Sequence, residues 1–206
     1  MGFYCLFHLW YDFGVLGSLK KLTMNDFKLF TVKAGDNSTK DGFPTLIGNS
    51  LSFAVAFNEN CLYDVPEPYS YAYSKVYGFK EGIWYDRNKN DFVDRYSARL
   101  GFRPVKKRGI FQLAPYVHYY NEDTKAIINL GSKDPEVVYE AKPKETIYCN
   151  IDIIGDKYVF YIMSKRVECQ RGKGHWLRYT SRMFIGGKFT LNHDASLYLK
   201  RLKSNL

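Results

Sequence analysis

The chain has 206 residues, a formal charge of +9 and a mean hydropathy of −0.35, and 46% of its residues are hydrophobic. These values suit one soluble globular domain with a full core, and they exclude a small scaffold that depends on disulfide or metal staples. Aromatic residues make up 17% of the chain, led by 18 tyrosines and 15 phenylalanines. Such residues fit half-buried pleated strands, so the composition favours β structure.

Positive charge is concentrated in the last quarter of the chain. Residues 156–206 hold 11 of the 30 Lys and Arg but 3 of the 21 Asp and Glu. This pattern fits a solvated strand face, and it also fits a surface for phosphate, an acidic glycan or an acidic protein. Trp176, Tyr179 and Phe184 lie among the basic residues. A nucleic-acid partner is not expected, because no signature of a nucleic-acid-binding fold occurs.

Residues 2–17 are apolar and aromatic, but His8 and Asp12 interrupt them. They lack the basic start and cleavage site of a signal peptide, and they are too short and polar for a membrane span. Three interpretations remain: an arm or strand packed on the domain, an over-extended start with Met24 as initiator, or an arm for a neighbouring subunit. We expect an arm at 1–24, a β domain at 25–206, and a location in a virion or the cytoplasm.

Short apolar runs alternate with turn residues along the chain, which is typical of a sandwich or barrel. The expected strands are residues 27–34, 51–57, 96–103, 111–120, 126–130, 146–154, 158–163, 176–185 and 195–202. Gly155-Asp156 predicts a tight turn between two of them. Residues 58–90 are expected to be irregular, with tyrosines that either stack on sugar rings or fold back onto the domain. A short helix is expected within residues 86–94.

The clearest alternation lies in residues 96–121. Leu100 and Phe102 alternate with Arg99 and Arg103 in the first half, and the second half alternates in the same way. A period of two directs one set into a core and the other onto a second face. We therefore predict an all-β, two-sheet antiparallel sandwich. Its second face is expected to bind a ligand through six side chains: Arg99, Arg103, Gln112, Tyr116, His118 and Tyr120.

Neither the cysteines nor the histidines form a metal-binding pattern. The four cysteines have no CxxC spacing, and Cys149 alternates in phase with core isoleucines, so free thiols are favoured over disulfides. His193-Asp194 is the one adjacent pair of metal-ligand types, and we interpret it as a polar turn. No metal and no cofactor are therefore expected.

Five stretches carry a family resemblance through their order and spacing. They are residues 33–35 (KAG), 75–79 (KVYGF), 97–103 (SARLGFR), 114–119 (APYVHY) and 184–187 (FIGG), the last followed by His193-Asp194. The chain resembles uncharacterised single-domain proteins of bacteria and phages, within the concanavalin A-like, or laminin G-like, jelly-roll superfamily. It departs from that pattern at Leu191-Asn192, where Ala-Pro is expected. The resemblance covers residues 33–202 and implies a two-sheet jelly roll with one concave face, but no activity.

Catalytic motifs are weak. Lyases on this fold use Arg, Gln, His and Tyr on the concave sheet, and the predicted face has these residue types. The Gln-x-His spacing and the Tyr-Phe-Lys-Ala-Gly strand of alginate-type lyases are missing, as are the paired carboxylates of a hydrolase, a nucleophile motif and a phosphate loop.

No catalytic residue is therefore assigned, and we expect a non-enzymatic binding or assembly module. The leading reading is a phage or phage-like structural protein, such as a capsid decoration or tail-associated component. The alternatives are a carbohydrate-binding lectin-like domain and a polysaccharide lyase acting on an acidic glycan. The expected partners are an acidic glycan or protein, or virion subunits, and self-association is left open.

Overall fold

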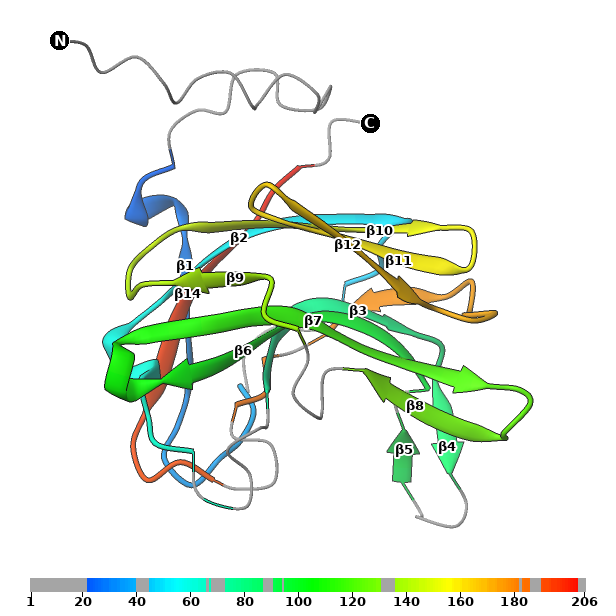
Figure 1. Ribbon diagram of the computed structural model, residues 1–206, viewed down its shortest axis with the longest axis horizontal. Coiled ribbons are helices and arrows are strands. Elements are labelled where there is room, and N and C mark those ends of the chain that lie inside the picture. The colour runs from blue at the N-terminus through cyan, green and yellow to red at the C-terminus, as the bar shows by residue number, and fades with distance from the viewer. Residues whose placement is uncertain are drawn as a thin grey trace, which may run out of the picture.

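The computed structural model describes residues 22–39, 45–65, 67, 73–86, 91–93, 95–130, 136–181, 183–185 and 190–203. Their strands form two large antiparallel sheets, here called sheet A and sheet B, which are stacked face to face (Figure 1). This is the two-sheet antiparallel sandwich that the sequence predicts, and it is consistent with a jelly roll. The expected arm at 1–24 lies almost entirely outside the described residues, so the domain boundary stays a prediction.

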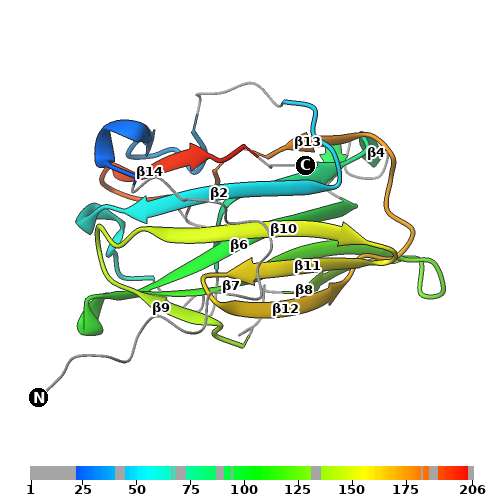
Figure 2. The ribbon, with the colours of Figure 1, turned by 90° about the horizontal axis from the view of Figure 1, so that it is seen from above.

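Sheet A has six strands, seen side by side from above in Figure 2. Their spatial order is β1 (Lys28–Val32), β14 (Ala195–Arg201), β2 (Ser50–Phe57), β10 (Ile147–Ile154), β11 (Lys157–Ile162) and β12 (Lys165–Gln170). Gly155, with φ of +60°, makes the predicted tight turn between β10 and β11. The left-handed conformation suits glycine, which has no Cβ to clash.

Sheet B has β13 (Arg178–Thr180), β3 (Ser74–Glu81), β6 (Tyr96–Val105), β7 (Ile110–Asn121) and β8 (Ala126–Leu130) in spatial order. The short β9 (Tyr139–Ala141) also pairs with β7, and β4 (Trp84–Asp86) pairs with β5 (Asp91–Val93) in a separate ribbon. Three 3-10 turns complete the described elements: η1 (Met24–Asp26), η2 (Glu59–Cys61) and η3 (Lys106–Arg108). No described helix is long and apolar enough to cross a membrane.

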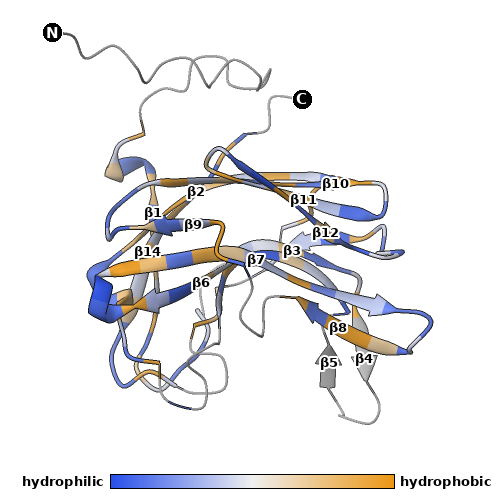
Figure 3. Ribbon diagram, viewed as in Figure 1, coloured by the Kyte–Doolittle hydropathy of each residue, from blue (hydrophilic) through white to orange (hydrophobic). Residues whose placement is uncertain are grey.

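The core lies between the sheets and is built from the predicted alternation. Phe53 and Val55 of β2, Leu100 and Phe102 of β6, and Ile151 of β10 are at most 1% exposed and belong to one cluster. Figure 3 shows hydrophobic stretches along β2 and β7. Side chains of opposite parity on β6 and β7 point to the other face of sheet B, so the core fixes what that face displays.

Two local predictions are wrong. The expected helix within residues 86–94 is replaced by β4 and β5, which pair from Trp84 with Val93 to Asp86 with Asp91. Residues 58–90, expected to be irregular, contain the whole of β3. A β-bulge between Lys75 and Gly78 breaks the alternation of β3, which hides the strand from a period-two pattern.

Candidate functional site

The outer face of sheet B, which is turned away from sheet A, carries the predicted ligand residues. All six lie on β6 and β7 and have the parity that leaves the core. In the antiparallel register Arg99 pairs with Tyr116, and Arg103 pairs with Gln112. Cross-strand partners lie on the same side of a sheet, within contact distance. These four side chains therefore lie on one face of two adjacent strands, as expected, while ligand binding by them stays a prediction.

The outer face extends onto β3, which sequence reasoning missed. The bulge sends Val76 and Tyr77 toward the core, where the Tyr77 ring meets Phe53 edge-on with centroids 5.3 Å apart. Lys75, opposite Gly101, and Lys80, opposite Ser97, then lie on the outer face. The bulge thus adds two ammonium groups beside the arginines of β6.

Gly78 makes this arrangement possible. It pairs with Arg99, and a Cβ on Gly78 would lie 2.0 Å from the Ala98 carbonyl oxygen and 2.6 Å from the Arg99 Cα. These are backbone atoms, which cannot rotate away. Only glycine therefore allows β3 to approach β6 at the position of Arg99.

Tyr116 is at the centre of the outer face. Its hydroxyl accepts a hydrogen bond of 3.1 Å from Asn129 Nδ2 on β8. The Lys75 ammonium lies 4.7 Å from the centre of the Tyr116 ring, and the His118 ring packs against it with centroids 5.4 Å apart. Tyr73 covers part of this region, forming a small buried cluster with Ala114 and Tyr116. Tyr116 is thereby held from several sides and is 6% exposed.

Near the β6–β7 turn, polar side chains of the outer face form hydrogen bonds with one another. Arg103 donates to the Gln112 side-chain oxygen from Nε (3.2 Å) and Nη2 (2.7 Å), and its guanidinium lies 5.0 Å from the centre of the Tyr73 ring. Gln112 in turn donates to Glu140, which also accepts from Arg108. This network positions Arg103 and Gln112 relative to each other.

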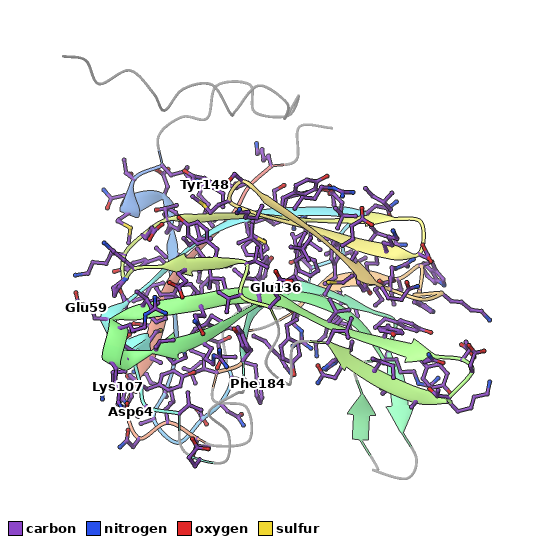
Figure 4. All side chains as sticks on the ribbon, viewed as in Figure 1. Glu59, Asp64, Lys107, Glu136, Tyr148 and Phe184 are labelled. Carbon is purple, nitrogen blue, oxygen red and sulfur yellow. The ribbon has the colours of Figure 1, made fainter. Side chains whose placement is uncertain are left out.

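Arg99 lines a cavity of about 270 Å³ at the β3 edge of the outer face. Its lining residues are Ser38, Lys80, Arg99, Tyr179, Thr180, Ser181, Met183 and Phe184. Arg99 is 3% exposed, and Phe184 pairs with the backbone of Lys75 on the side of sheet B away from sheet A (Figure 4). Two cations, several hydroxyls and an apolar wall thus meet at this edge, an arrangement suited to an anionic group on an organic ring.

The sixth predicted residue, Tyr120, lies toward the far end of β7. It pairs with Ile127, and the Arg95 guanidinium lies 4.7 Å from the centre of its ring. Of the six predicted residues, Arg99 alone lines the cavity described above. The side chains that sequence reasoning missed, Lys75, Lys80, Asn129 and Tyr179, come from β3, β8 and β13 and join the face only through strand pairing.

His193-Asp194 forms structural contacts, as its interpretation as a polar turn predicts. Asp194 binds Lys33 Nζ at 2.7 Å and the Ala34 backbone N–H at 3.0 Å, and His193 Nε2 lies 3.0 Å from the Asn60 carbonyl oxygen. No group of three or more His, Cys, Asp or Glu that is suited to a metal ion occurs within the described part of the chain.

The chain matches no protein-family model, and no curated protein sequence resembles it. Solved structures with a similar fold include alginate lyases. The enzyme from Klebsiella pneumoniae has a TM-score of 0.45 and 12% identity over 75% of this chain, and the match spans only 58% of that enzyme. AlyA1 from Zobellia galactanivorans has a TM-score of 0.44 and 10% identity over 85% of this chain and 78% of its own.

The expected function needs correction. The prediction of a non-enzymatic phage structural module is contradicted: the solved structures reported above are alginate lyases, not virion proteins. That prediction rested in part on the absence of a contiguous catalytic motif. On a sheet, however, polar groups meet through cross-strand register, so a site needs no contiguous sequence. At such identities the likeness shows the fold alone.

Proposed function

We propose that the chain binds an acidic polysaccharide across the outer face of sheet B and cleaves it by β-elimination. The observation that carries this proposal is the register of β6 and β7, which sets Arg99 opposite Tyr116, with His118 against the Tyr116 ring. Arg99, which can bind a carboxylate, therefore lies beside Tyr116 and His118, which can exchange protons.

Binding is supported by the charge and the length of the face. Lys75, Lys80 and Arg99 supply positive charge on adjacent strands. One row of cross-strand partners runs across the sheet as Leu46, Tyr179, Lys80, Ser97, His118 and Asn129. At about 4.8 Å per strand, this row spans roughly 24 Å, which is long enough to contact several sugar rings. Repeated carboxylates of a polyuronate would complement the cations along it.

The elimination needs a base, an acid and stabilisation of a carbanion. Arg99 would stabilise the negative charge that develops on the uronate carboxylate. His118 would remove the proton from the carbon that bears this carboxylate. The electrons of that C–H bond then form a C=C bond, the glycosidic C–O bond to the neighbouring ring carbon breaks, and the Tyr116 hydroxyl protonates the leaving oxygen.

The test is cleavage of a panel of polyuronates, alginate among them, with a neutral glucan as the negative control. Each elimination creates one unsaturated uronate, which absorbs in the ultraviolet. We expect Tyr116→Phe and His118→Asn to lower kcat by about 100-fold or more, because proton transfer contributes about 10²–10⁴-fold. Tyr198→Phe is the matched control, since Tyr198 lies on β14 in the other sheet. Absence of cleavage of every polyuronate would refute the elimination.

Carbohydrate binding without cleavage is the second candidate, and one observation favours it. Tyr116 is 6% exposed, which limits its access to a glycosidic oxygen. In that case the wild-type chain is retarded in a polyuronate gel but yields no unsaturated product. Self-association and the finer resemblance to a bacterial or phage family stay predictions from the sequence.

A further inference from the structure

Trp176 is the most exposed of the large apolar side chains in the described part of the chain, at 78%. It lies in the loop between β12 and β13. The His175 ring stacks on the indole with an interplanar angle of 28° and a centroid distance of 5.6 Å. Because the imidazole covers one face of the indole, the high exposure belongs to the other face and the edges. The indole thus presents a flat aromatic surface to solvent and is supported on its other face by the His175 ring.

The loop that carries Trp176 is anchored by a buried carboxylate. Arg171 donates two hydrogen bonds to Glu81, of 2.8 and 2.6 Å, and the His175 backbone N–H donates a third, of 2.8 Å. The Arg171 backbone N–H also donates to the Asp156 carbonyl in the turn between β10 and β11. The loop is therefore fixed to both sheets, although its aromatic residues face solvent.

Glycine is required where the loop crosses Arg171. Gly174 has φ of +60°, and a Cβ there would lie 2.1 Å from the Arg171 guanidinium. That guanidinium is held by Glu81 and cannot move away without breaking the ion pair. The chain then turns so that the Leu177 N–H donates to His175 Nδ1 over 3.0 Å, which fixes the imidazole under the indole. Such prior ordering reduces the entropy lost when a ligand binds.

The loop that carries Trp176 adjoins the β13 edge of the outer face of sheet B. The Gly82 N–H donates to the Leu177 carbonyl, and two residues further along β13 Tyr179 occupies the cross-strand row with Lys80. The exposed Lys173 adds positive charge within the same loop. An aromatic ring beside cations favours a ligand that combines flat C–H surfaces with negative charge, as an acidic sugar does.

We propose that Trp176 is a stacking platform for a sugar ring of the same acidic polysaccharide, at a distance from the reacting bond. This inference rests on the proposed function and extends it, since it predicts a preference for long chains. A short oligosaccharide bound around Tyr116 does not reach the loop, whereas a polymer contacts both. Trp176 then contributes to affinity for the polymer and leaves the chemical step unchanged.

Steady-state kinetics of Trp176→Ala on polymer and on a short oligosaccharide test this proposal. KM for the polymer should rise at least about fivefold, the loss typical of an aromatic residue that matters in binding, with kcat unchanged. KM for the short oligosaccharide should not change. Trp176→Phe keeps a ring and should recover most of the affinity. An unchanged KM for the polymer, or an equal rise for both substrates, would overturn the platform.

Ile83→Ala is the matched control, because Ile83 is 68% exposed, adjoins Gly82 and lacks a ring. Equal loss in both variants would indicate a general apolar docking surface and would overturn the sugar platform. Retardation in a polyuronate gel separates this inference from the elimination. If the wild-type chain cleaves nothing but is retarded, and Trp176→Ala alone reduces retardation, the elimination fails and the platform stands. Equal retardation of the wild-type chain and Trp176→Ala overturns the platform whether or not cleavage occurs.

Discussion

Glu81 of β3 and Arg171, the residue after β12, form a buried two-point ion pair that joins the two sheets. Their side chains are 0% and 7% exposed, and the shortest distance between them is 2.6 Å. The Tyr158 hydroxyl of β11 and the His175 backbone N–H donate to the same carboxylate. Burial of a charge is costly unless it is paired and hydrogen-bonded, and these four donors satisfy that condition.

Loss of the charge on Glu81 should therefore destabilise the fold strongly. Glu81→Gln leaves the Arg171 guanidinium buried without its counter-ion, and breaking such a pair costs about 3–5 kcal/mol. Urea denaturation measures the change. The double variant Glu81→Leu with Arg171→Met removes both charges. Its loss of stability should be smaller than the summed losses of Glu81→Leu alone and Arg171→Met alone. Strict additivity would show that the two side chains do not interact.

The same pair predicts how stability depends on pH. Burial raises the pKa of Glu81, but hydrogen bonds from Arg171, Tyr158 and His175 outweigh burial and hold the pKa below its ordinary value of 4.5. The unfolded chain then takes up this proton at a higher pH than the folded chain. The stabilisation is fully present above pH 4.5 and disappears as pH falls through the folded pKa. The stability gap between the native chain and Glu81→Gln should narrow below pH 4.5, and a gap that widens there would contradict this account.

Leu100 is the most direct test of the shared core. It is 0% exposed on β6 and belongs to the cluster between the sheets. Leu100→Ala should lower the free energy of unfolding by about 2–5 kcal/mol, because the surrounding side chains cannot fill the cavity. Leu130→Ala on β8, where the leucine is 38% exposed, is the matched control and should cost much less. Equal costs for the two variants would show that Leu100 is not in the core.

The fold was predictable where one face of a strand is buried and the other is polar. β6 and β7 meet that condition, and so does β10, so period-two alternation located all three strands. The alternation of β3 is interrupted by its bulge, and β9 has only three residues. Pairing with β6 and β7 holds these strands in place, and no local pattern records such pairing.

The candidate site was predictable only within its central hairpin. Arg99 and Tyr116 could be placed together because a hairpin fixes its own register. Lys75 and Asn129 join them through pairings between strands that are distant in sequence. Sequence reasoning likewise noted Trp176 as an aromatic residue among basic ones, but the Glu81 anchor lies about ninety residues earlier along the chain. The link between them exists only in the folded protein.

The described cysteines should resist alkylation in the native state. Cys61, Cys149 and Cys169 are free, and burial raises the pKa of each thiol, to about 12 for Cys61 and about 11 for Cys169. The thiolate is the reactive form of cysteine. Because these pKa values lie well above 8, very little thiolate exists at pH 8. Mass spectrometry after iodoacetamide treatment should find these three cysteines unmodified until a denaturant is added. Rapid native modification of Cys61 would show that its surroundings open readily.

Gly78→Ala tests the close approach of β3 to β6 that places Lys75 and Lys80 beside Arg99. The added methyl group would lie 2.0 Å from the Ala98 carbonyl oxygen, so the strands must separate or shift register. We expect a loss of about 1–3 kcal/mol or more, as for other overpacked sites, together with weaker polyuronate binding. Gly48→Ala is the matched control, because a Cβ there meets no atom within 4 Å and its φ is not in the left-handed region. Thermal unfolding and gel retardation should change together for Gly78→Ala and remain near the native values for Gly48→Ala. Native stability in Gly78→Ala would mean that β3 does not approach β6 as closely as this bulge requires, and the assignment of its lysines to the outer face would then fail.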